Sequence, residues 1–182
     1  MLLSLFISVF QHRYKFIKQD KLEQILYAFT SYILSYFLLK YGFDKLLLRQ
    51  FYTPESNTLF TPVGALSKDI LFWTSMGTSK TYNIFMGLAE IIPGLLLLHH
   101  KTRIFGAFSA FGVLLNVFMI NAGFDISVKL LSLYLVIGTV YILTPVLKQF
   151  FDLFIRQREI SVLKPPHLLF SNSRLKKTIK VM

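Results

Sequence analysis

Long apolar stretches bounded by basic residues dominate the pattern of this chain. A helix that crosses about 30 Å of hydrocarbon needs roughly 20 residues nearly free of charge. Four stretches meet this requirement, at about residues 22–39, 81–98, 104–124 and 130–147. They are continuous and apolar on all sides instead of alternating, so helices are the spanning structure that satisfies their backbone. The pattern predicts an all-α integral membrane protein, an antiparallel bundle of four transmembrane helices.

Composition agrees with this prediction and excludes several classes. The chain is 54% hydrophobic, with 19 Phe and 9 Tyr but no cysteine. So much apolar surface excludes disorder, and the lack of cysteine excludes a disulfide scaffold, a thiolate metal site and a covalent c-type haem. The chain has a net charge of +11, and its basic residues lie outside the apolar stretches. This distribution is typical of a membrane protein in contact with lipid, and we expect no nucleic-acid partner.

The basic residues also predict the orientation. If both termini are cytoplasmic, that side receives fourteen Lys and Arg, whereas the opposite side receives six. The excess favours both ends inside, in a multi-pass protein of the cell (inner, cytoplasmic) membrane.

Three parts are expected along the chain. Residues 1–21 form a basic N-terminal segment, whose apolar start at 1–10 is too short to span and is interpreted as an interfacial helix or the remnant of a preceding segment in a longer ancestor. Its basic residues follow the apolar run, which is unlike a signal peptide. Residues 22–147 form the four-helix domain, and residues 148–182 form a basic amphipathic cytoplasmic tail attracted to anionic lipid.

The long connection between the first two spans, residues 49–80, contains a short apolar stretch. Asp69 to Met76 carries Trp73, the single Trp of the chain. Because Trp favours the membrane surface, we expect a short helix on the outer face, with a re-entrant element as the alternative.

Glu90 is the acid that most needs an explanation. A charge within hydrocarbon costs about 2.5–3.5 kcal/mol, so the side chain requires a partner, a water-filled cavity or a proton. Asn83, Gly87 and Gly94 share its helix face, and the glycines permit close helix contact. We expect Glu90 to point into the bundle. Pro93 leaves a carbonyl one turn earlier without a donor, which is found both in ligand sites and in plain packing.

The third span has a similar polar stripe. Ser109, Gly112, Asn116 and Gly123 lie on one face, and the depth of Asn116 differs from that of Glu90 by about 6 Å at 1.5 Å per residue. Asn116 is therefore expected to be the neighbour of Glu90, and both are candidates for ligand binding or proton exchange.

Two further candidates lie on the first helix. Tyr41 and Lys45 share a stripe if that helix continues past Leu39. Lys45 or Lys129 is expected to pair with Asp125 or, less easily, with Glu90. The alternative is a charge network that only locks helix ends together.

Other chemistry has little support. His99 and His100 are adjacent where a helix meets the inner surface and point about 100° apart, and no histidine lies deep in a span, so haem and metal are not expected. The chain has no phosphate-binding loop, dinucleotide fingerprint or Ser/His/Asp arrangement.

Five motifs in order resemble the DoxX-like family of small four-helix integral membrane proteins. They are Tyr41–Lys45, Leu71–Gly77, Gly87–Glu90, Asn116–Asn121 and Phe124–Leu130. The resemblance covers about residues 25–150 and implies a four-helix bundle with a loose association with respiratory or redox chemistry. Members of that family include a subunit of thiosulfate:quinone oxidoreductase and parts of small complexes that counter oxidative stress.

The resemblance also points to site residues, which are Tyr41, Lys45, Trp73, Glu90, Asn116, Asn121, Asp125 and Lys129. Of these, Trp73, Asn121, Asp125 and Lys129 are expected to be structural or interface residues. The chain departs from the similar proteins at Asp44, where they have Ala, and at Ser127, where they have Pro. Asp44 beside Lys45 offers a charge that neutralises the lysine, which argues against a role for Lys45 in anion binding.

Two functions remain open. The first is a membrane subunit, accessory to an oxidoreductase, that binds a quinone-like molecule in a polar pocket around Glu90. The second is a non-enzymatic scaffold or assembly partner, in which Glu90 serves folding and Phe-rich surfaces bind another membrane subunit or a second copy. A transporter is a third, although four helices without a detectable inverted repeat are few for one.

Overall fold

The computed structural model describes residues 19–156. Within this part of the chain all regular structure is helical. The elements are α2 (Gln19–Leu46), α3 (Ser56–Leu59), the 3-10 turn η1 (Val63–Ala65), α4 (Lys68–Gly77), α5 (Lys80–Leu98), α6 (Arg103–Gly123) and α7 (Lys129–Phe154). The prediction of an all-α protein is confirmed for the described residues.

Four of these helices are long and apolar enough to cross a membrane. The spans are Leu22–Leu46 in α2, Lys80–Leu98 in α5, Arg103–Gly123 in α6 and Lys129–Leu147 in α7. Three of them contain a predicted segment in full, and Arg103–Gly123 ends one residue before the end of the predicted segment 104–124. The first helix continues past Leu39, so Lys45 lies in the last turn of α2.

The described residues belong to two units. Residues 19–28, the start of α2, lie in one unit, and residues 29–156 lie in the other. The second unit contains the rest of α2 and all the other helices, and every contact discussed below lies within it.

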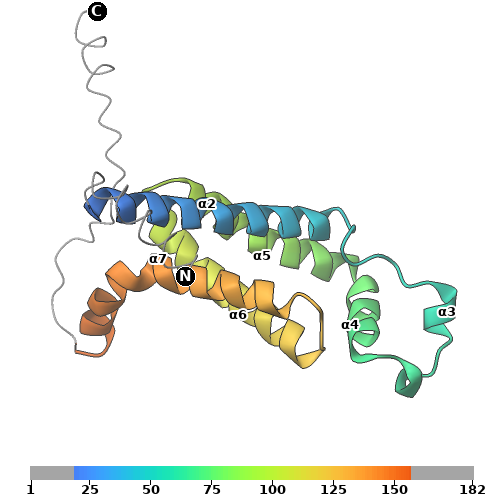
Figure 1. The fold of residues 1–182 in the computed structure, drawn as a ribbon. Helices are drawn as coiled ribbons and strands as arrows, with labels where there is room; N and C mark the ends of the chain where they lie inside the picture. Colours follow the sequence, from blue (N-terminus) through green and yellow to red (C-terminus); the bar gives the residue numbers. More distant parts are fainter. Residues whose placement is uncertain (1–18, 157–182) are drawn as a thin grey trace, which may run out of the picture. The chain divides into compact units, whose positions relative to one another are not determined.

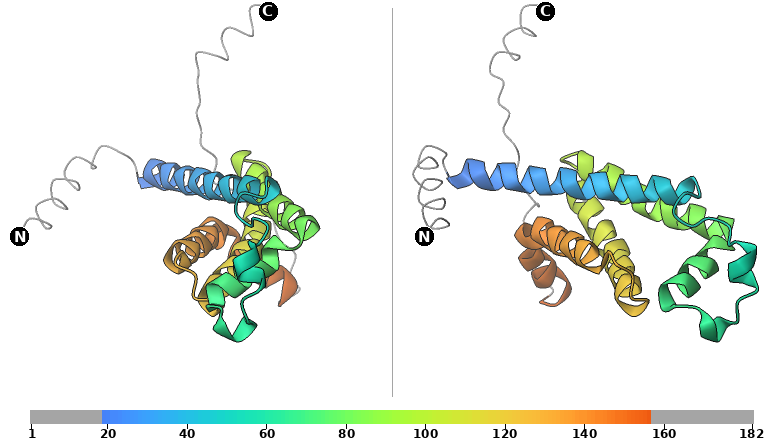
Figure 2. Two further views of the ribbon diagram at one scale, coloured as in Figure 1. Left: turned by 90° about the vertical axis from the view of Figure 1, so that its right-hand side faces the viewer. Right: turned by 45° about the vertical axis from the view of Figure 1, so that its right-hand side comes forward.

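Within this second unit, α2 lies beside α5, and α6 packs against both α5 and α7 (Figures 1 and 2). Leu34 of α2 also approaches α7, since a Cβ built on Gly138 would lie 3.3 Å from its side chain. Short turns join α5 to α6 and α6 to α7, so these successive helices run antiparallel. The four helices therefore surround a common interior.

The contact between α2 and α5 depends on glycine. A Cβ on Gly42 would lie 2.9 Å from the carbonyl oxygen of Gly87, and a Cβ on Gly87 would lie 2.8 Å from that of Gly42. About two turns away on both helices, the buried Ser35 hydroxyl donates to the Gly94 carbonyl oxygen at 2.7 Å. The small residues beside Glu90 thus let two backbones approach closely, as the sequence predicted.

The connection from α2 to α5 folds onto one end of the helices, where α3 and α4 lie (Figures 1 and 2). The predicted short helix around Trp73 is present as α4. Phe51, Phe72 and Ile126 form a buried cluster against which Trp73 packs. This cluster joins the connection to the turn between α6 and α7.

The two predicted end segments fall mostly outside the described residues. Residues 1–18 of the basic N-terminal segment and residues 157–182 of the tail are not described. The first residues of the expected amphipathic tail are described, and they continue α7, which extends past Leu147 to Phe154.

Candidate functional site

A buried ion pair joins α2 to α5. The Lys45 ammonium donates to both carboxylate oxygens of Glu90, at 2.7 Å to Oε1 and 2.8 Å to Oε2. The two side chains are only 5% and 3% exposed. Glu90 therefore points into the bundle as predicted, and its partner is Lys45, the pairing that sequence reasoning considered the harder one to form.

The local sequence explains this pairing. Lys45 is three residues beyond Gly42, and Glu90 is three residues beyond Gly87, so each charged side chain lies about one turn from the closest backbone contact. The long apolar stem of lysine lets its ammonium reach inward from the end of a helix. Ion pairs this deeply buried are costly to break, because removing one partner leaves the other charge uncompensated.

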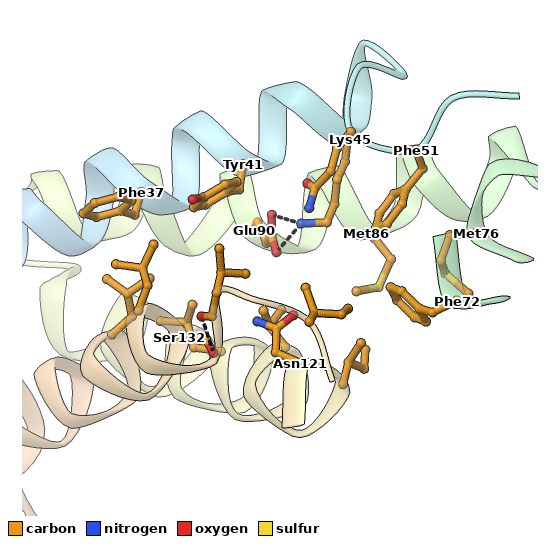
Figure 3. Close-up of a pocket in the computed structure, with 18 of the residues that line it drawn as sticks. Phe37, Tyr41, Lys45, Phe51, Phe72, Met76, Met86, Glu90, Asn121 and Ser132 are labelled. Atoms are coloured by element: carbon orange, nitrogen blue, oxygen red, sulfur yellow. Dashed lines mark hydrogen bonds and ion pairs between the residues drawn. The ribbon is translucent and has the colours of Figure 1, made fainter. Parts of the chain in front are cut away.

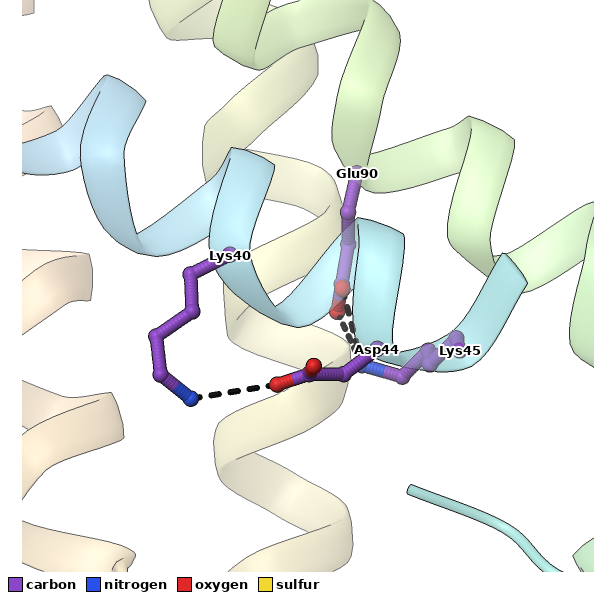
Figure 4. Close-up of polar contacts among 4 residues, drawn as sticks. All are labelled: Lys40, Asp44, Lys45 and Glu90. Atoms are coloured by element: carbon purple, nitrogen blue, oxygen red, sulfur yellow. Dashed lines mark hydrogen bonds and ion pairs between the residues drawn. The ribbon is translucent and has the colours of Figure 1, made fainter. Parts of the chain in front are cut away.

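A second ion pair on α2 is separate from the first. Lys40 donates to Asp44 Oδ2 at 3.1 Å, near the surface, while Lys45 turns to Glu90 (Figure 4). The expectation that Asp44 neutralises Lys45 is therefore wrong. Residues 44 and 45 point about 100° apart on a helix, so they face different surroundings.

The Lys45–Glu90 pair lies in the wall of a pocket between the helices (Figure 3). The pocket encloses about 870 Å³ of space outside the protein atoms, its open mouth included. Most of the lining is apolar, and much of it is aromatic: Phe37, Tyr41, Phe51, Phe72, Trp73 and Tyr82.

Helical spacing brings the lining residues together. Phe37, Tyr41 and Lys45 recur every four residues on α2, and Tyr82, Met86 and Glu90 do so on α5. Side chains four residues apart lie on one helix face, so each helix contributes a stripe. Sequence reasoning identified Tyr41, Lys45 and Glu90 but missed their apolar neighbours on the same stripes, although this spacing was visible.

Some lining residues had no such signal. Gln50 and Phe51 come from the connection after α2, and Ser132 comes from α7. The ring of Phe51 packs at a tilt against that of Trp73, with ring centroids 5.1 Å apart. The folding of the connection onto the helices brings Gln50 and Phe51 to the pocket, and the packing of α7 brings Ser132.

The polar residue that faces the pair from α6 is Asn121. It lines the pocket, is 6% exposed, and points from α6 toward the side where Lys45 and Glu90 lie (Figure 3). Asn116, by contrast, is exposed and does not line the pocket. The expectation that Asn116 neighbours Glu90 is wrong. The reason is the rotation of α6, which turns the stripe of Gly112, Asn116 and Gly123 outward.

Trp73, Asp125 and Lys129 complete the set of predicted residues. Trp73 lines the pocket from α4. Lys129 forms an ion pair with Asp125, four residues earlier, in the exposed turn between α6 and α7. The hydrogen bond and charge of Lys129 hold the pKa of the Asp125 carboxyl below its usual value. This pair is a helix-end contact outside the pocket.

The described residues contain no group of three or more His, Cys, Asp or Glu that would hold a metal ion. His99 and His100 are exposed in the turn between α5 and α6, with ring centroids 4.6 Å apart.

Over residues 19–156, these features define an all-helical protein with four helices apolar enough to cross a membrane and an internal pocket that holds a buried lysine–glutamate pair. The chain is 33% identical over 123 residues to the uncharacterized protein YwoB of Bacillus subtilis (strain 168), a match that covers 66% of this chain and 75% of that protein. The chain therefore belongs to the family of YwoB. No family model matches the chain. No solved structure matches it either.

Proposed function

We propose that this protein is a multi-pass protein of the cell membrane whose pocket binds an amphipathic, quinone-like small molecule, with Glu90 exchanging a proton with the bound molecule. The observation that carries this proposal is the buried Lys45–Glu90 pair in the wall of a pocket lined mainly by aromatic and aliphatic side chains. Within a membrane, ionisable side chains of this kind are expensive and mark ligand or proton pathways by default.

The lining favours a flat apolar ligand with one polar edge. Aromatic rings stack or meet edge to face at centroid distances of about 4.5–7 Å, so a planar molecule can pack against the aromatic lining of the pocket, which includes Phe37 and Tyr41. Lys45, Glu90 and Asn121 supply the polar side of the same pocket. A pocket with an apolar body and few polar groups is the usual form of a small-molecule site.

The redox part of the proposal is supported by the resemblance to the DoxX-like family. In this role the protein is an accessory subunit, Glu90 exchanges a proton with the bound molecule, and electrons pass to or from a partner subunit. The orientation with both termini inside is supported by the excess of Lys and Arg on that side.

The test begins with the purified protein. After extraction in mild detergent, we expect a solvent extract to contain a quinone-like molecule in stoichiometric amount, and a Glu90→Gln variant to retain much less. Glu23→Gln is the matched control, because Glu23 is an exposed acid at the start of α2. A host that carries stable Glu90→Gln protein and keeps full tolerance to quinone and oxidant stress would contradict the proposal.

A second candidate function is a membrane scaffold. It is favoured by the outward stripe of α6, where Cβ atoms on Gly112 and Gly123 would meet nothing within 4 Å and Asn116 is exposed. Small residues and an amide on the outside of a spanning helix are typical of a contact with another helix. If the scaffold role is the correct one, Asn116→Leu abolishes co-purification of a partner subunit, while Glu90→Gln lowers only yield.

A further inference from the structure

Asn121 has an unused hydrogen-bonding group inside the pocket. Its backbone carbonyl accepts from the Ile126 amide at 2.9 Å, which holds the residue at the end of α6. Its side chain is buried and lines the pocket, yet within the described residues its amide makes no hydrogen bond. The amide is accessible from the pocket, where it offers both N–H donors and a carbonyl acceptor. The Asn121 amide is therefore available for a hydrogen bond with a polar group of a ligand.

On the opposite wall of the pocket, the Lys45 ammonium makes two hydrogen bonds, both to the Glu90 carboxylate. Lys45 has three N–H donors and gives two of them to Glu90. The pair as a whole is neutral. A ligand that enters with a negative charge, and with nothing else, leaves a net charge in an apolar environment, which is very unfavourable. If one proton enters together with the anionic ligand, the pocket stays neutral.

We infer that the ligands of this pocket include lipophilic carboxylic acids, each bound as the anion together with one proton. The inference rests on the proposed function, because both concern the same pocket. The proton resides on Glu90, the carboxylate of the ligand replaces that of Glu90 on Lys45, and Asn121 donates an N–H to it. A neutral acid that enters from lipid brings this proton itself, and an anion that enters from water takes one from solution. In both cases the pocket stays neutral.

The other groups that face the pair do not compensate for this charge. Tyr41 on α2 and Tyr82 on α5 are the remaining titratable residues among the described lining of the pocket. The lining residues from α4, α6 and α7 are uncharged, and those from α6 and α7 contribute only Asn121 and Ser132 as polar side chains. Glu90 is therefore the acceptor for the proton.

The experiment compares 4-butylbenzoate with the neutral isostere 4-butylbenzamide on the full-length protein in lipid nanodiscs. Trp73 lines the pocket and is the single Trp of the chain, so its fluorescence reports occupancy directly. Calorimetry in two buffers of different ionisation enthalpy counts the protons taken up. We expect about one proton per bound benzoate, an affinity that falls about tenfold per pH unit above neutrality, and no proton uptake with the benzamide.

Variants separate the roles of the three residues. Glu90→Gln is permanently neutral, so its benzoate affinity should no longer depend on pH and should exceed that of the wild type at pH 8. Asn121→Leu removes an amide that makes no hydrogen bond with the described residues, so this variant should fold and yet bind benzoate at least about tenfold more weakly. Asn116→Leu is the matched control on the same helix, outside the pocket, and should bind as the wild type does.

The outcomes also separate this inference from the proposed function. Benzoate binding without proton uptake, or equal benzoate affinities of Asn121→Leu and Asn116→Leu, overturns the inference. Binding of the benzamide or of a short-chain ubiquinone with no benzoate binding overturns the inference and leaves the proposed function standing. No change in Trp73 fluorescence with any of the three probes contradicts both.

Discussion

The ammonium of Lys45 lies against both carboxylate oxygens of Glu90, although 45 positions separate the two residues in the chain. Lys45 comes from the last turn of α2 and Glu90 from the middle of α5. The pair therefore connects the end of one helix to the interior of the next. It also forms the charged part of the pocket wall (Figure 3).

Loss of one partner should destabilise the protein strongly. Lys45→Met leaves the Glu90 carboxylate buried without a counter-charge, and we expect a loss of about 3–5 kcal/mol in unfolding free energy. Denaturation in detergent measures it. The double variant Lys45→Met with Glu90→Leu should recover most of the loss, because an apolar pair of similar volume has no desolvation penalty. Failure of the double variant to recover would show that the pair is not the cause.

Close packing of α2 on α5 should require glycine at position 87. A Cβ there would lie 2.8 Å from the Gly42 carbonyl oxygen and 3.0 Å from the Leu46 nitrogen, both backbone atoms that cannot move independently. Gly87→Ala is expected to cost about 1–3 kcal/mol by overpacking. Gly112→Ala is the control, since its Cβ would meet nothing within 4 Å. In an open helix position the same change should stabilise by about 0.5–1 kcal/mol.

The Asp125–Lys129 contact should appear in a pH titration. Lys129 lowers the pKa of Asp125, so the contact stabilises the folded state above the ordinary carboxyl pKa and is lost as the pH falls through the folded value. Carbon-13 NMR of the Asp125 carboxyl should report a midpoint below the usual aspartate value. In Lys129→Met the midpoint should rise toward that usual value, and an unchanged midpoint would contradict the assignment of the shift to Lys129.

The proposed orientation predicts which loops are accessible from which side. The chain has no native cysteine, so single cysteines give an unambiguous signal. Gly64 lies between α2 and α5 and Lys101 between α5 and α6, and both are exposed. With both termini inside, an impermeant maleimide added to intact cells should label Gly64→Cys and spare Lys101→Cys. The opposite pattern would reverse the orientation.

The sequence by itself determined the elements. Four apolar segments are helices in the structure, and a short helix carries Trp73, because both features depend on local hydrophobicity and on backbone hydrogen bonds that close within each segment. It also determined that Glu90 faces inward, since two glycines share its face and mark the side of close contact.

Only the tertiary structure decided which side chains meet. Asn116 and Asn121 are five residues apart and point about 140° away from each other on a helix, so only one of them can face the pocket. Periodicity defines a helix face without stating what lies opposite, and the rotation of α6 against its neighbours selected Asn121. The partner of Glu90 was decided in the same way. The close approach of Gly42 to Gly87 brings Lys45 within reach, and this is a contact between helices that no pattern along one helix contains.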